Sequence, residues 1–157
     1  MKKLMNLLLS LTLVLALAGC GKEQTATYVM DMSQDGVGIV DTMVYKATGD
    51  IVYQMDETVT IDLSGVDDET KELLVAYYDE YYGAMGTDVP KGVEFSASYE
   101  NDVYTVICNL NLKEGDLQEL SDGGYLVFTT DNGDTAKVIS FKQTCEYCEA
   151  AGYVLQQ

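Results

Sequence analysis

The 157-residue chain has 26 acidic residues against nine lysines, no histidine, arginine or tryptophan, and a formal net charge of −17. Without histidine and arginine it cannot assemble Ser-His-Asp or Cys-His catalysis, a His-ligated zinc site or bidentate phosphate recognition by arginine. Because so acidic a surface is repelled by phosphate backbones, we expect no nucleic-acid partner. Carboxylate, tyrosine, lysine and cysteine chemistry remains.

The first residues have the pattern of a bacterial lipoprotein signal. Lys2 and Lys3 precede an apolar run, and Leu-Ala-Gly-Cys at 17–20 resembles a lipobox. We predict a signal peptide at 1–19 and a palmitate-type lipid anchor on Cys20. A retained membrane helix or cleavage without lipid is the alternative, but the run is shorter than the roughly 18 to 20 residues that span a bilayer.

Loss of the signal would leave seven lysines against 26 acidic residues, a formal charge of −19. We expect residues 20–26 to be the lipidated cysteine and a short tether, and residues 27–157 to be one domain. The expected location is the cell membrane, on its extracytoplasmic face, with the membrane as a partner through Cys20.

An alternation of apolar and polar residues begins at Thr27 and predicts a three-strand antiparallel meander. Asp35-Gly36 predicts the first hairpin turn, in a register that sets Tyr28 opposite Met43. Residues 47–50 predict the second turn. On the sheet face shared with Tyr28 and Met43, the third strand would carry Tyr53, Met55, Val59, Ile61 and Leu63.

A long helix is predicted after Asp67, whose side chain can cap its first turn. The apolar residues recur at three-to-four spacing and indicate one broad stripe facing a core. The helix should end near 83–86. The stripe consists of Leu73, Leu74, Tyr77, Tyr78, Tyr81, Tyr82 and Met85.

A second hairpin is predicted across Asn101-Asp102. Its core face would pair Val93, Phe95, Ala97 and Tyr99 with Tyr104, Val106, Cys108 and Leu110. Residues 114–121 are expected to form a short helix that buries Leu117 and Leu120, and residues 125–129 have strand composition. Ser140 with Gln143 predicts the start of a last helix, Phe141 to Ala151, closed by Gly152.

Several segments occur in an order that resembles the YehR-like family of small bacterial lipoproteins. They are 44–46, 49–54, 57–58, 93–112 and 139–153. The resemblance implies a two-layer α/β fold and no established biochemical activity. The chain departs from the family pattern in Ala47-Thr48, in its three mature-domain cysteines and in 125–134.

We therefore expect a single α+β domain of the two-layer sandwich type. Its antiparallel sheet would have about five strands, in the chain order three-strand meander, helix, hairpin, helix. The helices would lie on one face of the sheet.

The cysteines allow a redox or a structural interpretation. Cys145 and Cys148 form a CxxC, but both fall late in the predicted helix, where its dipole does not lower a thiol pKa. We therefore interpret them and Cys108 as core residues, and a disulfide from Cys108 to either of the others stays open. Three thiolates without histidine make a poor zinc site.

Two acidic loops resemble cation sites. Asp31 to Gly36 matches the first half of a calcium loop, but Thr42 stands where a bidentate glutamate is required. An ordinary Asp-Gly hairpin is the favoured interpretation there, and an acidic turn at 131–134.

Asp41 and Glu57 interrupt the apolar sheet face on adjacent strands, where the covering helix is expected to stop short. They could form a carboxylate pair with a raised pKa or a cation site, although a solvated end of the sheet is favoured. Tyr77 and Tyr82 could flank the helix stripe as a binding platform, although such stripes are more often core.

Together these patterns predict a non-enzymatic binding or accessory lipoprotein of the cell envelope. We expect no catalytic residue, no cofactor and no resident metal, and an envelope protein or small ligand as partner. The alternative is a divalent-cation-binding or carboxylate-based enzyme domain that uses Asp41 and Glu57.

Overall fold

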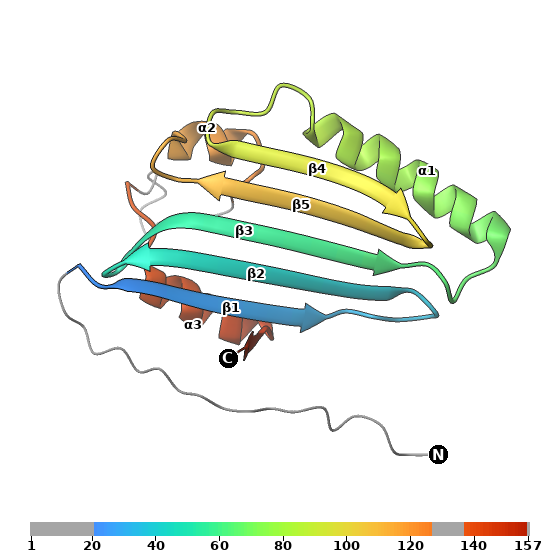
Figure 1. Cartoon of the computed structure of the whole chain (residues 1–157), viewed down its shortest axis with the longest axis horizontal. Helices are drawn as coiled ribbons and strands as arrows, with labels where there is room; N and C mark the ends of the chain where they lie inside the picture. The colour runs from blue at the N-terminus through green and yellow to red at the C-terminus, as the bar shows by residue number, and fades with distance from the viewer. Residues whose placement is uncertain (1–20, 127–136, 157) are drawn as a thin grey trace, which may run out of the picture.

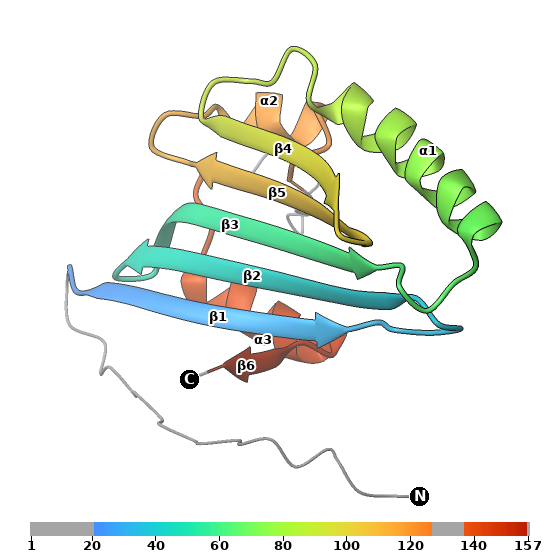
Figure 2. The same ribbon diagram turned by 45° about the vertical axis from the view of Figure 1, so that its right-hand side comes forward.

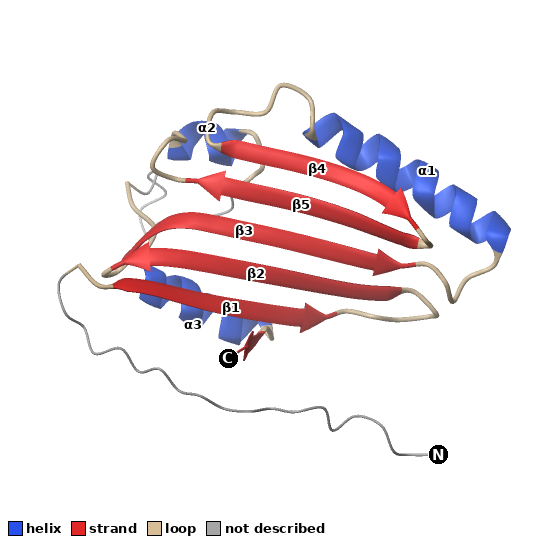
Figure 3. Cartoon of the chain, viewed as in Figure 1, coloured by secondary structure: helices blue, strands red, loops and turns tan. Residues whose placement is uncertain are grey.

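A computed structural model describes residues 21–126 and 137–156, which form six strands and three helices (Figures 1 and 3). The strands form one antiparallel sheet in the order β4-β5-β3-β2-β1-β6. The strands are β1 (Glu23–Asp31), β2 (Gly38–Thr48), β3 (Ile51–Asp62), β4 (Val93–Glu100), β5 (Val103–Asn111) and β6 (Val154–Gln156). The helices are α1 (Asp68–Met85), α2 (Leu117–Asp122) and α3 (Phe141–Ala151). The α+β class is confirmed, with six strands in place of about five.

The sixth strand is the C-terminal β6, which follows α3 and pairs with Thr27–Val29 on the free edge of β1 (Figure 2). Gly152 makes this return possible because it ends α3 in the left-handed conformation, at φ +98°. Three residues are too few for a strand pattern to stand out in a sequence.

All three predicted turns are confirmed, the one at 47–50 as Gly49-Asp50 between the paired residues Thr48 and Ile51. Asp35 and Gly36 have φ of +51° and +84°, and Tyr28 lies opposite Met43. Asn101 and Asp102 have φ of +52° and +65° and connect β4 to β5 in the predicted register. Positive φ at both central residues is the geometry that lets a two-residue turn match the twist of its strands.

The first strand begins at Glu23, four residues earlier than the predicted Thr27. Gln24, Ala26 and Tyr28 continue one alternation, and Ala26 is only 8% exposed. The Gln24 side-chain amide also donates to the Gly49 carbonyl at 2.5 Å. Residues 23–26, expected in the tether, therefore pair within the sheet.

Tyr53 does not lie on the core face, contrary to the prediction. The register of β2 and β3 shifts between Lys46 and Ala47, so Val52 takes the core position and is 3% exposed. The Tyr53 hydroxyl instead donates to Glu23 at 2.7 Å. A bulge of this kind reverses the facing of the residues on one side of it.

The helices cover one face of the sheet, on which the cross-strand rows such as Tyr28, Met43, Glu57, Cys108 and Phe95 lie. The chain forms three apolar clusters on this face, each with side chains from a helix or its flanking loops. In Figure 1 the sheet lies in front of α3. No described helix packs on the opposite face.

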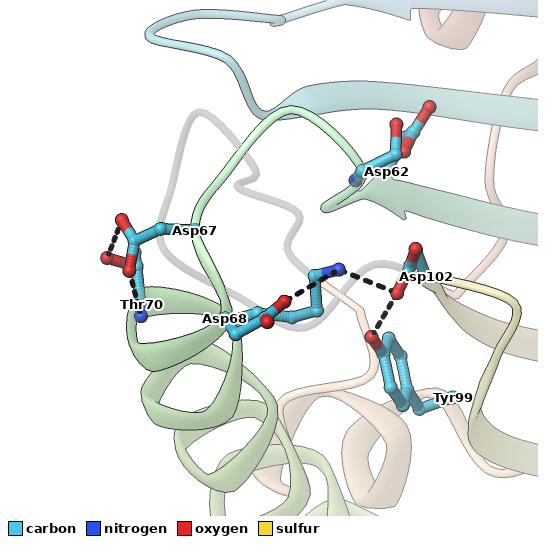
Figure 4. Close-up of polar contacts among 8 residues, drawn as sticks. Asp62, Asp67, Asp68, Thr70, Tyr99 and Asp102 are labelled. Carbon is cyan, nitrogen blue, oxygen red and sulfur yellow. Dashed lines mark hydrogen bonds and ion pairs between the residues drawn. The ribbon is translucent and has the colours of Figure 1, made fainter.

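The long helix α1 begins and ends as predicted, with Asp67 as its cap, 3.0 Å from the Thr70 amide. At its first turn Lys71 lies 2.8 Å from Asp102, which also accepts a hydrogen bond from Tyr99 (Figure 4). These contacts fix the start of α1 to the β4–β5 turn.

Only part of the predicted apolar stripe of α1 packs against the sheet. Leu74, Tyr78 and Tyr82 pack against the cluster around Tyr104, whereas Leu73, Tyr77 and Tyr81 are exposed, and α1 has no fully buried residue. The stripe is too broad for a single contact with the sheet, so its outer half stays in solvent.

The C-terminal elements largely follow the predictions. Leu120 is fully buried in α2, and the Ser140 hydroxyl accepts from the Gln143 amide at the start of α3. Tyr125 and Leu126 are not in a strand. The rest of the expected strand and the 131–134 turn lie outside the described residues. Within the described part of the chain no helix is long and apolar enough to span a membrane.

Gly65 tests the contact between the β1–β2 turn and the loop after β3. A Cβ there would lie 2.2 Å from the Gly36 carbonyl oxygen. We expect Gly65→Ala to lower the free energy of unfolding by about 1–3 kcal/mol, measured by urea denaturation. Gly83→Ala is the control, because its Cβ meets nothing within 4 Å; it should raise helix stability by up to about 1 kcal/mol. Equal stability of Gly65→Ala and wild type would contradict this packing.

Candidate functional site

Asp41 on β2 and Glu57 on β3 lie on the helix-covered face of the sheet, as predicted. Asp41 is opposite Val59 and Glu57 is opposite Met43, so the two carboxylates are diagonal neighbours. Asp41 is only 5% exposed and is the buried charged residue of the described core. The solvated sheet end favoured from the sequence is therefore wrong for Asp41.

Tyr153 is the partner of Asp41. Its hydroxyl donates to Asp41 Oδ2 from the short connection between α3 and β6, while Asp41 Oδ1 is buried without a hydrogen-bond partner. Figure 2 shows how this connection returns past the end of α3 toward β1. The role of Tyr153 was not predictable from the sequence, because nothing local to the C-terminus indicates that β6 brings it to the sheet.

Burial disfavours the ionised form of both carboxyl groups. Burial raises the pKa of Asp41, and the hydrogen bond from Tyr153 opposes that shift in part. Burial also raises the pKa of Glu57, and the nearby Asp41 charge raises it further. A pair whose pKa values are raised in this way can hold a proton at higher pH than an exposed carboxylate does.

The three thiols near this site are free, and Cys108 and Cys148 are buried. Burial raises the pKa of Cys108 to about 11 and raises the pKa values of Cys145 and Cys148. Cys148 Sγ is 3.4 Å from the Tyr45 hydroxyl oxygen. Raised pKa values suppress the thiolate, which favours the core interpretation over the redox one.

Cys108 also belongs to a different apolar cluster from Cys148. The disulfide between Cys108 and the CxxC, left open by the sequence, is not formed in this structure. Cys20, the predicted lipidation site, lies outside the described residues.

The Asp31 to Gly36 segment is an ordinary hairpin turn. Asp31 Oδ1 accepts from the Ser33 amide at 2.9 Å, and the Ser33 hydroxyl accepts from the Ile39 amide at 2.9 Å. The loop oxygens thus serve the turn itself. Across residues 21–126 and 137–156, no group of three or more Asp, Glu or Cys side chains is placed to hold a metal ion.

The two tyrosines predicted as a possible binding platform differ in their exposure. Tyr82 packs between the sheet residues Phe95 and Tyr104, with ring centroids 6.4 and 6.0 Å away. Tyr77 is 58% exposed on the other side of α1. Only Tyr77 is therefore available to a ligand.

The fold and these side chains define an α+β domain with an open antiparallel sheet, helices on one face and a carboxylate pair beneath them. A family model described as a protein of unknown function, DUF1307, matches residues 24–154. The chain belongs to this family.

Two solved structures share the fold. The NMR structure of the E. coli YehR protein is 21% identical in sequence and has a TM-score of 0.56. The match covers 86% of this chain and 91% of the YehR chain. An NMR structure of a protein from Streptococcus pneumoniae is 17% identical in sequence and has a TM-score of 0.52. The match covers 99% of this chain and 98% of that protein's chain. No curated protein matches the chain. The YehR-like architecture expected from the sequence is thus confirmed.

Glu57→Gln tests the raised pKa of the pair. A carboxyl whose folded pKa is raised contributes stability below its unfolded pKa, near 4, and loses that contribution as pH rises through the folded value. We expect Glu57→Gln to be more stable than wild type at about pH 7, and the difference to shrink as pH falls toward about 4. Urea denaturation across this pH range measures both.

Glu94→Gln is the matched control, because it removes the same charge from an exposed position on β4. An equal gain in Glu94→Gln would show that relief of general charge repulsion, and not the pair, accounts for the effect.

Proposed function

We propose that the chain is a lipid-anchored, extracytoplasmic binding or accessory module of the cell envelope and not an enzyme. One observation supports it beyond the signal-like N-terminus. The sheet begins at Glu23, three residues after Cys20. An acyl group on Cys20 would hold the start of β1 within roughly 10 Å of the membrane surface.

The connection to that anchor is stiff. The Gly49 amide donates to the Lys22 carbonyl at 2.9 Å, so the chain is fixed to the β2–β3 turn from Lys22 onward. Gly21 is the single residue left between this hydrogen bond and Cys20. A tether so short would restrict how the domain turns on the membrane, which suits a module that presents one surface to a partner.

The charge distribution agrees with an anchor at this end. Lys22 directly precedes β1, and the Lys113 ammonium lies 3.8 Å from the centroid of the Tyr53 ring, whose hydroxyl donates to Glu23. Acidic residues lie at both ends of the strands, but the lysines Lys22 and Lys113 are at the anchor end, where Glu23 and Asp50 also lie, while the opposite end carries Asp31, Asp35, Asp62, Asp67 and Asp68. Anchoring at Cys20 would keep that acidic end away from anionic headgroups, which lowers the electrostatic cost.

A binding role is favoured over catalysis because the reactive groups are covered. The thiols have raised pKa values, and Asp41 is buried under the α3–β6 connection. Exposed apolar side chains, in contrast, lie on α1. An envelope protein or a small ligand is the expected partner.

Cys20→Ala tests the anchor. In cells fed a radiolabelled fatty acid, we expect wild type to take up label and to enter the detergent phase of a Triton X-114 extract. Cys20→Ala should do neither, since the diacylglyceryl group on Cys20 would supply the membrane affinity. Cys108→Ala is the control thiol and should behave as wild type. Unlabelled wild-type protein in the aqueous phase would refute lipidation.

A cation-binding or carboxylate-based enzyme domain is the second candidate. The unpaired buried Oδ1 of Asp41 favours it, because a buried oxygen without a donor is expensive and a cation would satisfy it. Glu57 would be the second ligand, or one carboxyl would act as acid and the other as base.

This candidate predicts that millimolar calcium, magnesium or manganese raises the melting temperature of wild type, because a ligand that binds only the native state stabilises it. The double variant Asp41→Asn/Glu57→Gln should lose that response. Melting temperatures that are unchanged by all three ions would remove the metal version.

A further inference from the structure

The outer side of α1 carries a strip of exposed apolar side chains, which we name the α1 strip. Leu73, Tyr77 and Tyr81 recur every four residues and are 68%, 58% and 54% exposed. The rings of Tyr77 and Tyr81 stack with centroids 6.2 Å apart, and Tyr81 also meets Tyr82 edge to face. The strip is therefore an ordered aromatic surface with nothing from the described chain packed on it.

The strip leads into an open hollow of about 810 Å³ beside the last turns of α1. Tyr125 forms its far wall and donates its hydroxyl to the Met85 carbonyl, which ties the wall to the helix. A volume between roughly 300 and 1,000 Å³ is usual for ligand sites in proteins. The hollow is lined by Tyr77, Glu80, Tyr81, Ala84, Met85, Thr87, Asp88, Pro90 and Gly123 to Tyr125.

The charged residues that line the hollow, Glu80 and Asp88, are both acidic, although the exposed Lys91 follows Pro90 at its edge. Glu69, Glu72 and Glu80 are exposed along α1, and Asp88 lies at the rim of the hollow. The lysine of α1, Lys71, is turned to Asp102 and its side chain is only 17% exposed. Neither the strip nor the lining of the hollow, as described, contains a cation.

We propose that the α1 strip and its hollow bind a basic, partly apolar peptide segment of a partner protein. The aliphatic stems of lysine or arginine side chains would lie over the tyrosine faces. Their ammonium or guanidinium groups would pair with Glu80 and Asp88. The aliphatic residues between them would fill the hollow. An anionic lipid surface is repelled by these carboxylates, and a neutral ligand would leave them unpaired.

The position of α1 suits such a partner. The helix lies beside β4, at the opposite edge of the sheet from β1, where the proposed anchor begins (Figures 1 and 2). Four strand spacings of about 4.8 Å separate β4 from β1, so roughly 19 Å of sheet lies between the strip and the start of the proposed anchor. This inference rests on the binding role proposed above but not on lipidation.

The test measures peptide binding to the full chain in phosphatidylcholine nanodiscs by fluorescence anisotropy. The probe is a short acetylated peptide of alternating lysine and leucine, compared with lysine-glycine and glutamate-leucine peptides. We expect lysine-leucine to bind best and glutamate-leucine not at all. Tyr77→Ser/Tyr81→Ser should raise the Kd about tenfold. Tyr147→Ser, which changes a 72% exposed tyrosine on α3, should leave the Kd unchanged.

Charge variants separate local attraction from the overall acidity of the chain. Glu80→Gln/Asp88→Asn should weaken lysine-leucine binding and flatten its salt dependence. Glu94→Gln/Glu100→Gln, which removes two charges from β4, should do so much less.

Equal weakening by the two charge pairs would overturn the proposal, as would binding that the tyrosine pair does not change. Preference for the glutamate-leucine peptide, or for a neutral oligosaccharide, would also overturn it. Cys20→Ala in detergent-free buffer keeps the two proposals apart. If that variant leaves the membrane but binds the peptide, both proposals stand; if wild type is anchored but binds no basic peptide, only the surface is refuted.

Discussion

The hydrogen-bonded ladder between β3 and β5 is the interaction on which the rest of the structure depends. It pairs residues 54–62 with residues 103–111 and so joins the N-terminal meander to the β4–β5 hairpin. Since facing residues share a side of the sheet, this one register aligns Met55 with Leu110 and Ile61 with Tyr104. Without it the meander and the hairpin would each have an apolar face and no common core. The same register requires α1 to run along the sheet and return the chain to the far side of β5, which places the helix at the β4 edge.

Elements determined by local chemistry were predictable from the sequence. Asp35-Gly36 and Asn101-Asp102 tolerate positive φ, and Asp67 and Ser140 satisfy the first amides of their helices, so turns and helix starts follow from a few neighbouring residues. Features that depend on distant partners were not. The shift at Lys46 and Ala47 turns Tyr53 away from the core, and β6 exists because β1 offers it an edge. The stripe of α1 predicted an apolar helix correctly, but the width of the contact with the sheet decides which of its residues are buried.

In the candidate site, too, local features were predictable from the sequence and long-range contacts were not. The parity of β2 and β3 was enough to place Asp41 and Glu57 on one face, because the side-chain period of a strand is two. The burial of Asp41 was not predictable, because it depends on the return of the chain after α3 and on Tyr153, whose importance no local pattern indicates. The cysteines show the opposite case: both lie beyond the first turn of α3, where the helix dipole lowers a thiol pKa little, and this local position was enough to favour core residues over activated thiols.

The absence of any fully buried residue in α1 has a consequence for the order in which the domain opens. A helix that contributes only half-buried side chains is held by less apolar area than the strands beneath it, so its backbone amides should exchange with solvent before those of β2, β3 and β5. Local release of α1 would uncover Tyr104 and Val106 while the six-stranded ladder stays intact. A ligand that packs on the outside of α1 therefore also protects the inside of the sheet. By stabilising the state in which α1 is docked, it would reduce the fraction of time that the core is exposed to water.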